Sequence, residues 1–251
     1  VPAQMFGILA GIFITRILGP EGRGVYSVYF TNTVMFSTIF GFSITNSIIY
    51  FTAKKSIPIE RLKSIILVLL LATLILSSVV VLVWLQFDSN LTQFFIPNHP
   101  ITILLVVYFI ATILISQLNA AFTSYFQGLR HFKIVNLVLI LNGIYSCVVF
   151  GIAYFLHVKG YYRFDFSAIV GLLVGILILN TIHWLYYYFK HGDWKFKFRF
   201  EWKNDFKPFL NFTFLNHFSN VLDFFNQRMI IWFIVLYLND NEELGIFSVG
   251  M

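Results

Sequence analysis

The sequence predicts an all-α integral membrane protein, a polytopic helix bundle. Three observations carry this prediction: long apolar runs recur along the chain, charged residues are scarce, and basic residues gather in alternate loops. Hydrophobic residues make up 59% and charged residues 11% of the 251 residues, and the mean hydropathy is +0.81. Soluble domains carry about 25% charged residues, so this chain cannot coat a water-exposed surface.

Seven apolar runs are the expected helices. A helix needs about 20 residues to cross the hydrocarbon core, and lipid offers no partner to free backbone groups. The runs are continuously apolar, whereas barrel strands would alternate every second residue. The first run is short and the chain opens on Val1, so we expect a trimmed N-terminus. In chain order the runs cover residues 2–18, 25–52, 64–87, 101–126, 134–157, 166–189 and 209–238.

The positive charge follows the alternation of the loops. Lys and Arg in short loops mark the cytoplasmic side of a membrane protein. The loops on the opposite side hold only Arg23, Lys159 and Arg163. This asymmetry predicts a cytoplasmic N-terminus and explains the net charge of +6 without nucleic acid as a partner. The loops after the second, fourth and sixth runs hold Lys54, Lys55, Arg61, Lys63, Arg130, Lys133, Lys190, Lys195, Lys197, Arg199, Lys203 and Lys207.

An eight-residue pattern occurs twice. Glu21–Val28 and Glu242–Val249 share E-x-x-G, an aliphatic residue, an aromatic residue and Ser-Val. Each copy opens the next helix, and six helices separate the two, as in transporters built from parallel repeats. Glu suits the first turn of a helix, and Gly permits a tight turn before it. We therefore expect a six-helix lobe over residues 1–189, a cytoplasmic linker over 190–208, and the first helix of a second lobe within 209–251.

The N-terminal segment Ile14–Val28 resembles the opening of the polysaccharide exporters and O-antigen flippases, in the multidrug/oligosaccharidyl-lipid/polysaccharide exporter superfamily. In the seventh run, Asp223 and Arg228 occupy the zone of a frequent Asp-Arg element, although at looser spacing. The resemblance implies two six-helix lobes around a central cavity. It also implies alternating-access transport of undecaprenyl-pyrophosphate-linked glycans across the bacterial inner membrane. The matching N-terminal residues are Arg16, Leu18, Gly19, Gly24, Tyr26 and Ser27.

Polar residues inside the seventh run form a stripe. Polar side chains in a membrane helix usually face a cavity or a partner, and steps of three or four residues share one helix face. The stripe indicates either a hydrated substrate cavity or hydrogen bonding between helices, and the carboxylate on it favours the cavity. Its members are Thr213, Asn216, Asn220, Asp223 and Gln227.

The predicted substrate-binding residues are Arg16, Asn216, Asn220, Asp223, Gln227 and Arg228. Arg16 could extend to the interface or bind an anionic group with its paired donors, and the resemblance favours binding. We expect packing for two further stripes and for isolated polar residues. These are Ser27, Thr31, Thr38, Gly41 and Thr45; Thr112, Ser116, Asn119 and Thr123; and Asn46, Gln117, Asn142, Asn180 and His183.

The segment Asp193–Lys203 alternates aromatic and charged residues. An extended conformation would put its rings on one face, where they would meet headgroups while Lys and Arg meet anionic membrane lipids. The alternative is an ordinary basic loop. A flanking span on each side argues against single-stranded nucleic acid as the partner.

The leading function is a flippase for a lipid-linked oligosaccharide in polysaccharide or O-antigen biosynthesis. The first alternative is a multidrug/cation antiporter of the same superfamily, although its N-terminal lobe should carry acidic residues that the first six runs lack. A membrane-embedded glycosyltransferase or acyltransferase would need paired acids or bases, and the loops show neither those nor Cys/His metal spacing. We expect no cofactor, and polysaccharide polymerase or glycosyltransferase partners.

Overall fold

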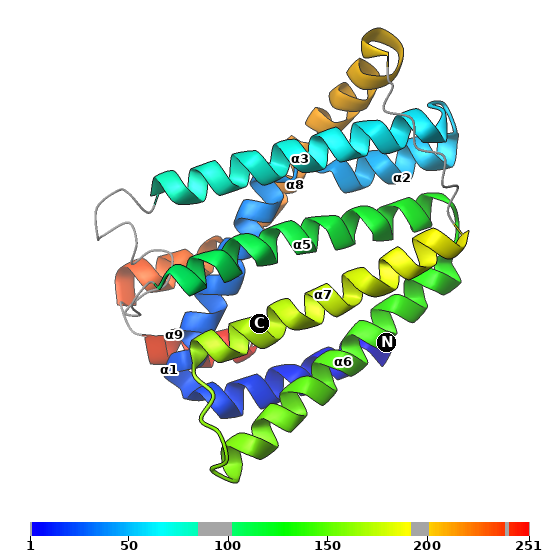
Figure 1. Ribbon diagram of the computed structural model, residues 1–251. Helices are drawn as coiled ribbons and strands as arrows, with labels where there is room; N and C mark the ends of the chain where they lie inside the picture. Colours follow the sequence, from blue (N-terminus) through cyan, green and yellow to red (C-terminus); the bar gives the residue numbers. More distant parts are fainter. Residues whose placement is uncertain (1, 85–101, 192–200, 239–240, 251) are drawn as a thin grey trace.

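The computed structural model describes residues 2–84, 102–191, 201–238 and 241–250, and these residues are helical apart from short turns. The predicted all-α membrane bundle is therefore confirmed (Figure 1). Its elements are α1 (Pro2–Phe40), α2 (Ile44–Lys54), α3 (Ile59–Trp84), α5 (Ile103–Gly128), α6 (Phe132–Val158), α7 (Phe166–His191), the π-helical turn η1 (Trp202–Phe206), α8 (Lys207–Leu238) and α9 (Asn241–Gly250).

Helix α1 joins two expected runs across a sharp bend (Figure 1). Gly19 has a φ of 69°, a conformation that residues with a Cβ rarely adopt. Pro20 follows it and cannot donate a backbone hydrogen bond to the preceding turn. The predicted end of the first run at residue 18 therefore coincides with the bend.

The second expected run, 25–52, is interrupted. A turn at Gly41–Ser43 separates α1 from α2, and both Phe42 and Ser43 have positive φ, at 46° and 51°. Hydropathy does not detect this break, because the residues on both sides of it are equally apolar. The break matters because it lies beside the main polar cavity described below.

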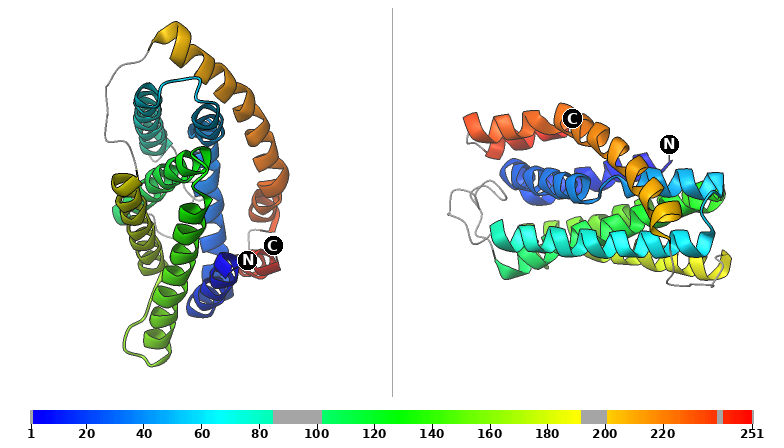
Figure 2. Two further views of the ribbon diagram at one scale, coloured as in Figure 1. Left: turned by 90° about the vertical axis from the view of Figure 1, so that its right-hand side faces the viewer. Right: turned by 90° about the horizontal axis from the view of Figure 1, so that it is seen from above.

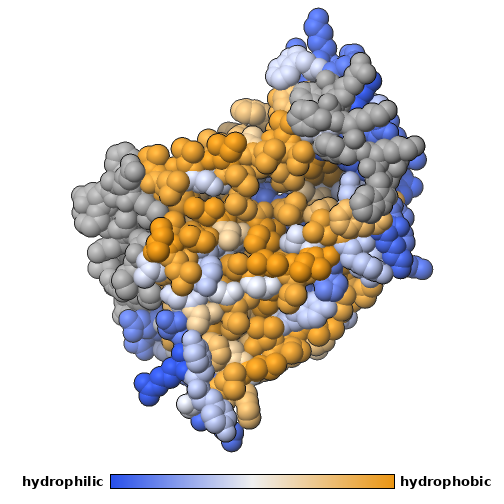
Figure 3. All heavy atoms as spheres, viewed as in Figure 1, coloured by the Kyte–Doolittle hydropathy of each residue, from blue (hydrophilic) through white to orange (hydrophobic). Residues whose placement is uncertain are grey.

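Five of the described helices are long and apolar enough to cross a membrane: α1, α3, α5, α6 and α7. Helix α8, which contains the polar stripe, falls outside this set. Figure 3 shows one broad hydrophobic face bounded by hydrophilic residues toward its ends. The α2–α3 and α5–α6 turns, the end of α7 and the start of α8 lie at one end of the bundle (Figure 1). The described parts of the predicted basic loops thus gather at a common end, called the basic end below.

Two clusters of buried side chains hold the bundle together. One joins α1 with the end of α3 and with α5, α6 and α7, and at its centre the fully buried Tyr29 ring meets Phe109 and Phe166 edge-on at 5.6 and 5.7 Å. The other joins α2, α3, α5, α6 and α7 with η1 and the start of α8, around Phe126 and Trp184, whose rings stack at 5.5 Å. These interdigitated aromatic contacts fix the helices against one another.

Helix α8 lies on the far side of α1 and α2 from α3, α5 and α7 (Figure 2). The predicted linker segment lies mostly outside the described residues, at 192–200. Its end is helical rather than extended, because η1 begins at Trp202. Arg61 of α3 holds this end with ion pairs to Glu201 at 2.8 Å and Asp205 at 3.2 Å.

Candidate functional site

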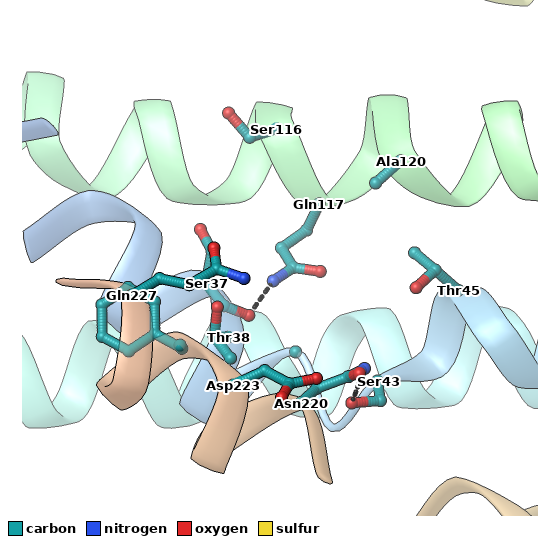
Figure 4. Close-up of a pocket in the computed structure, with 12 residues that line it drawn as sticks. Ser37, Thr38, Ser43, Thr45, Ser116, Gln117, Ala120, Asn220, Asp223 and Gln227 are labelled. Atoms are coloured by element: carbon teal, nitrogen blue, oxygen red, sulfur yellow. Dashed lines mark hydrogen bonds between the residues drawn. The ribbon is translucent and has the colours of Figure 1, made fainter. Parts of the chain in front are cut away.

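The polar stripe of α8 faces a cavity between α8 and the α1–α2 break. Asn220, Asp223 and Gln227 line it, and they project from α8 toward α1, α2 and α5 (Figure 4). Asp223 lies at the middle of α8, about 24 Å from the start of the helix and about 22 Å from its end at 1.5 Å per residue. The cavity volume is about 430 Å³, within the usual range of small-molecule sites.

The opposite wall comes from three elements. Helix α1 supplies Ser37 and Thr38, the break and α2 supply Ser43 and Thr45, and α5 supplies Ser116 and Gln117. The described lining therefore offers hydroxyls, amides and a single carboxylate, and it contains no Lys or Arg. Such a set can donate to and accept from hydroxyl groups, but it offers no positive charge to a phosphate.

Gln117 fixes the geometry of this wall. Its Nε2 donates a hydrogen bond to the backbone carbonyl of Ser37, near the end of α1 (Figure 4). A side chain at Gly41 would lie 2.9 Å from Cδ of Gln117, so only glycine permits this approach. Ser37 Oγ is itself buried and has no hydrogen-bond partner within the described residues. A buried hydroxyl without a hydrogen-bond partner costs free energy. A ligand that formed a hydrogen bond with Ser37 Oγ would remove this cost and bind more tightly for that reason.

The break between α1 and α2 connects the two walls. Asn220 Nδ2 donates to Ser43 Oγ at 2.8 Å, across 177 residues of sequence. Ser43 has a left-handed backbone, which is uncommon outside glycine and is found preferentially at functional sites. The strained turn thus presents a hydroxyl to α8 that a continuous helix would direct elsewhere.

Toward the basic end, α8 is attached to α2. Ser47 Oγ lies 2.6 Å from Thr213 Oγ1, and both residues are buried. Because Thr213 donates its proton to the carbonyl of Phe209 at 2.7 Å, Ser47 is the donor of the pair. Phe51 and Phe209 stack beside this contact at 5.2 Å.

Toward the opposite end, α8 is attached to α1. Trp232 Nε1 donates to Asn32 Oδ1 at 3.0 Å, and both residues are buried. Val28, Ile231 and Leu244 form a small apolar cluster next to this bond. The cavity therefore lies between two attachments of the same helix, one toward each end.

The two copies of the repeated pattern pack against each other. A Cβ built on Gly245 would lie 2.8 Å from the carbonyl carbon of Pro20 and 3.1 Å from the amide nitrogen of Gly24. Gly24 and Gly245 occupy the same position of the E-x-x-G pattern, and both are buried. Contact between equivalent positions is what a two-fold relation between repeats produces.

Three of the predicted site residues do not line this cavity. Arg16 is exposed, with its guanidinium carbon 6.0 Å from the Tyr154 ring centre. Asn216 donates to the carbonyl of Phe212 on its own helix at 2.8 Å. Arg228 is half-buried and comes directly after Gln227 in α8, but it does not line the cavity.

The expected packing stripes divide between two environments. Thr112 contacts the Tyr29 hydroxyl at 3.1 Å, and Asn119 accepts a hydrogen bond from Thr181 at 2.9 Å, so packing is confirmed there. Four further members line the cavity: Thr38, Gly41, Thr45 and Ser116. Gly41 also permits the close approach of Gln117, as a packing residue should. Gln117 was also expected to be structural and lines the cavity as well. In the sequence, the one sign that Gln117 could line a cavity is that it is a large amide in the middle of an apolar run.

No group of three or more His, Cys, Asp or Glu side chains that could hold a metal ion occurs within residues 2–84, 102–191, 201–238 and 241–250. No curated protein and no solved structure matches the chain. One family model does match, over residues 2–251. Because this match spans almost the whole sequence, the chain belongs to the polysaccharide biosynthesis protein family.

Proposed function

We propose that the protein is a flippase, not an enzyme, and that it moves a lipid-linked oligosaccharide across the bacterial inner membrane for polysaccharide or O-antigen biosynthesis. The observation that carries this proposal is the polar cavity at the middle of α8, whose opposite wall comes in part from α1 and α5, two helices long and apolar enough to cross a membrane. Membership of the polysaccharide biosynthesis protein family supports a glycan as the cargo. The basic end would face the cytoplasm, with the N-terminus on that side.

The chemistry of the lining favours the sugars over the pyrophosphate of such a substrate. Amides, hydroxyls and a carboxylate match the alternating donors and acceptors of a glycan, and the described lining has no cation for a phosphate. We therefore assign the cavity to sugar residues, with the lipid chain remaining in the bilayer. Arg16 and Arg228 stay predicted anion contacts outside this cavity.

Alternating access would use the two attachments of α8. In this mechanism, the Ser47–Thr213 contact and the Asn32–Trp232 contact separate in turn, so that the cavity opens toward one end at a time. The packed repeat at Gly24 and Gly245 would form part of the closure opposite the basic end. Residues 209–251 would then move as the beginning of a second lobe relative to residues 1–189.

One observation supports a second candidate function. Asp223 is the single carboxylate of the described lining, and a lone acid at membrane depth is typical of proton or cation coupling. A multidrug/cation antiporter would use Asp223 to bind the coupling ion. The two candidates differ in cargo: the antiporter would transport an organic cation, and the flippase would transport a glycan attached to a lipid.

The test is glycan export in a strain that depends on this protein for surface polysaccharide. Asp223→Ala removes a charged hydrogen-bond acceptor, for which we expect binding of undecaprenyl-pyrophosphate-linked oligosaccharide from that strain to weaken about 10- to 100-fold, with export lost. Asn220→Ala should weaken binding less, because a neutral amide contributes less than a carboxylate. Asn226→Ala is the matched control: the same amide on the same helix, exposed and outside the lining.

A second measurement separates a binding defect from misfolding. In a Cys147→Ser background, cysteines at positions 220 and 223 should react with a water-soluble thiol reagent, and added oligosaccharide should protect them. Normal export by Asp223→Ala would contradict the site assignment. Export of an organic cation that Asp223→Ala abolishes, with no glycan bound, would favour the antiporter.

A further inference from the structure

A second hollow lies on the other side of α5, away from the polar cavity. Helices α3, α5 and α7 each contribute residues at steps of three and four, which places them on single helix faces. The volume is about 220 Å³ and the walls are mainly apolar. It shares no lining residue with the polar cavity. Its main features are Lys63, Leu67 and Leu70 of α3, Phe122 and Tyr125 of α5, and Tyr188 of α7.

The charged end of this groove is a buried lysine packed against two aromatic rings. Lys63 is only 7% exposed, and its Nζ lies 5.2 Å from the Tyr188 ring centre and 5.9 Å from that of Tyr125. Stacked over two rings, the ammonium has few conformations available and is held in one place. These residues lie within the first turns of α3 and the last turns of α5 and α7, at the basic end.

The rim of the groove beside this charged end is a hydrocarbon surface. Leu67, one turn after Lys63, and Phe189, next to Tyr188, are 39% and 46% exposed, although both are large apolar side chains. In a bundle that crosses a membrane, this exposure is exposure to lipid. Helix α3 rises about 10 Å from Lys63 to Leu70. The groove therefore begins at a fixed positive charge and continues between apolar walls along the membrane normal.

We propose that this groove binds one anionic phospholipid of the leaflet at the basic end. The phosphate would meet the Lys63 ammonium at headgroup depth, and one acyl chain would lie between α3, α5 and α7. A fixed buried cation favours a net negative headgroup, whereas a choline headgroup would bring a second positive charge beside it. The proposal does not depend on the transported cargo, because the groove and the polar cavity have separate linings.

The experiment is native mass spectrometry of the purified full chain, titrated with phosphatidylglycerol or phosphatidylcholine of equal chain length. The expected result is a retained phosphatidylglycerol adduct and little retained phosphatidylcholine. Lys63→Met should weaken phosphatidylglycerol binding about fivefold, the effect of removing a Lys at a charged membrane surface. Lys54→Met is the matched control, because its Nζ also lies over a tyrosine, 5.1 Å from the Tyr50 ring, but outside the groove.

A second pair of variants tests whether the apolar part of the groove holds the acyl chain, without changing the charge of the protein. Leu67→Trp fills the rim of the groove and should abolish the adduct, whereas Leu71→Trp, on the neighbouring lipid-facing position, should not. Equal binding of the two lipids overturns the proposal, and so does an equal loss from Lys54→Met and Lys63→Met. Retained binding in Leu67→Trp also overturns it, because the lipid would then lie elsewhere.

Discussion

Replacing Gly245 with alanine tests whether the packed repeat closes the cavity at the end opposite the basic end. The new methyl group would lie 2.8 Å from the carbonyl carbon of Pro20 and 3.1 Å from the amide nitrogen of Gly24. Carbon atoms pack best at about 3.5–4.0 Å, and the carbonyl oxygen of Pro20 lies nearer still, so α9 must retreat by at least about 1 Å. All three obstructing atoms belong to the backbone, and no side-chain rotation can relieve the clash.

The expected cost of this overpacking is about 1–3 kcal/mol. If the cost falls on the closed arrangement alone, it changes the equilibrium between closed and open forms about 5- to 150-fold. Gln227 is the lining residue of α8 nearest that end, so a cysteine there reports the opening. In a Cys147→Ser, Gln227→Cys protein, Gly245→Ala should accelerate labelling by a membrane-impermeant thiol reagent added to intact cells.

The matched control is Gly11→Ala, since a Cβ at Gly11 would meet no atom within 4 Å. That variant should label at the parental rate. If Gly245→Ala is present in the membrane at normal levels and also labels at the parental rate, the repeat contact does not close the cavity and the argument is refuted. Slower labelling would mean that the methyl group stabilises closure, which the backbone distances do not allow.

Two further predictions concern an attachment of α8 and the wall of the cavity. Thr213→Val keeps the shape of the side chain but removes the acceptor of the buried Ser47 hydroxyl, so it should lower the free energy of unfolding in detergent by about 1–2 kcal/mol. Adding Ser47→Ala should cost less than the sum of the single changes, by about 0.6–1.7 kcal/mol; additive costs would show that the two hydroxyls do not interact. Gly41→Ala forces a Cβ against the Gln117 amide, so glycan export should fall while Gly11→Ala exports normally, and unchanged export would show that this approach is dispensable.

Much of the fold could be predicted because membrane insertion depends on local quantities. The free energy of transferring a helix into lipid sums over its own residues, so the apolar runs predicted the helices, including the end of the first at residue 18, next to the bend at Gly19. Positive charge in the loops is equally local, and it predicted which helix ends lie together. The α8 stripe was visible for the same reason, because its members are neighbours on one helix face.

The site required the tertiary structure, because its parts come from distant segments. Only packing decides that Gln117 meets the end of α1, that Ser43 takes a left-handed backbone beside Asn220, and that Arg16 lies away from both. The sequence alone determined a helical membrane bundle, its basic end and a polar face on α8. Only the tertiary structure decided which polar residues share a cavity, because that depends on helix contacts between residues up to 200 positions apart, which local hydropathy does not encode.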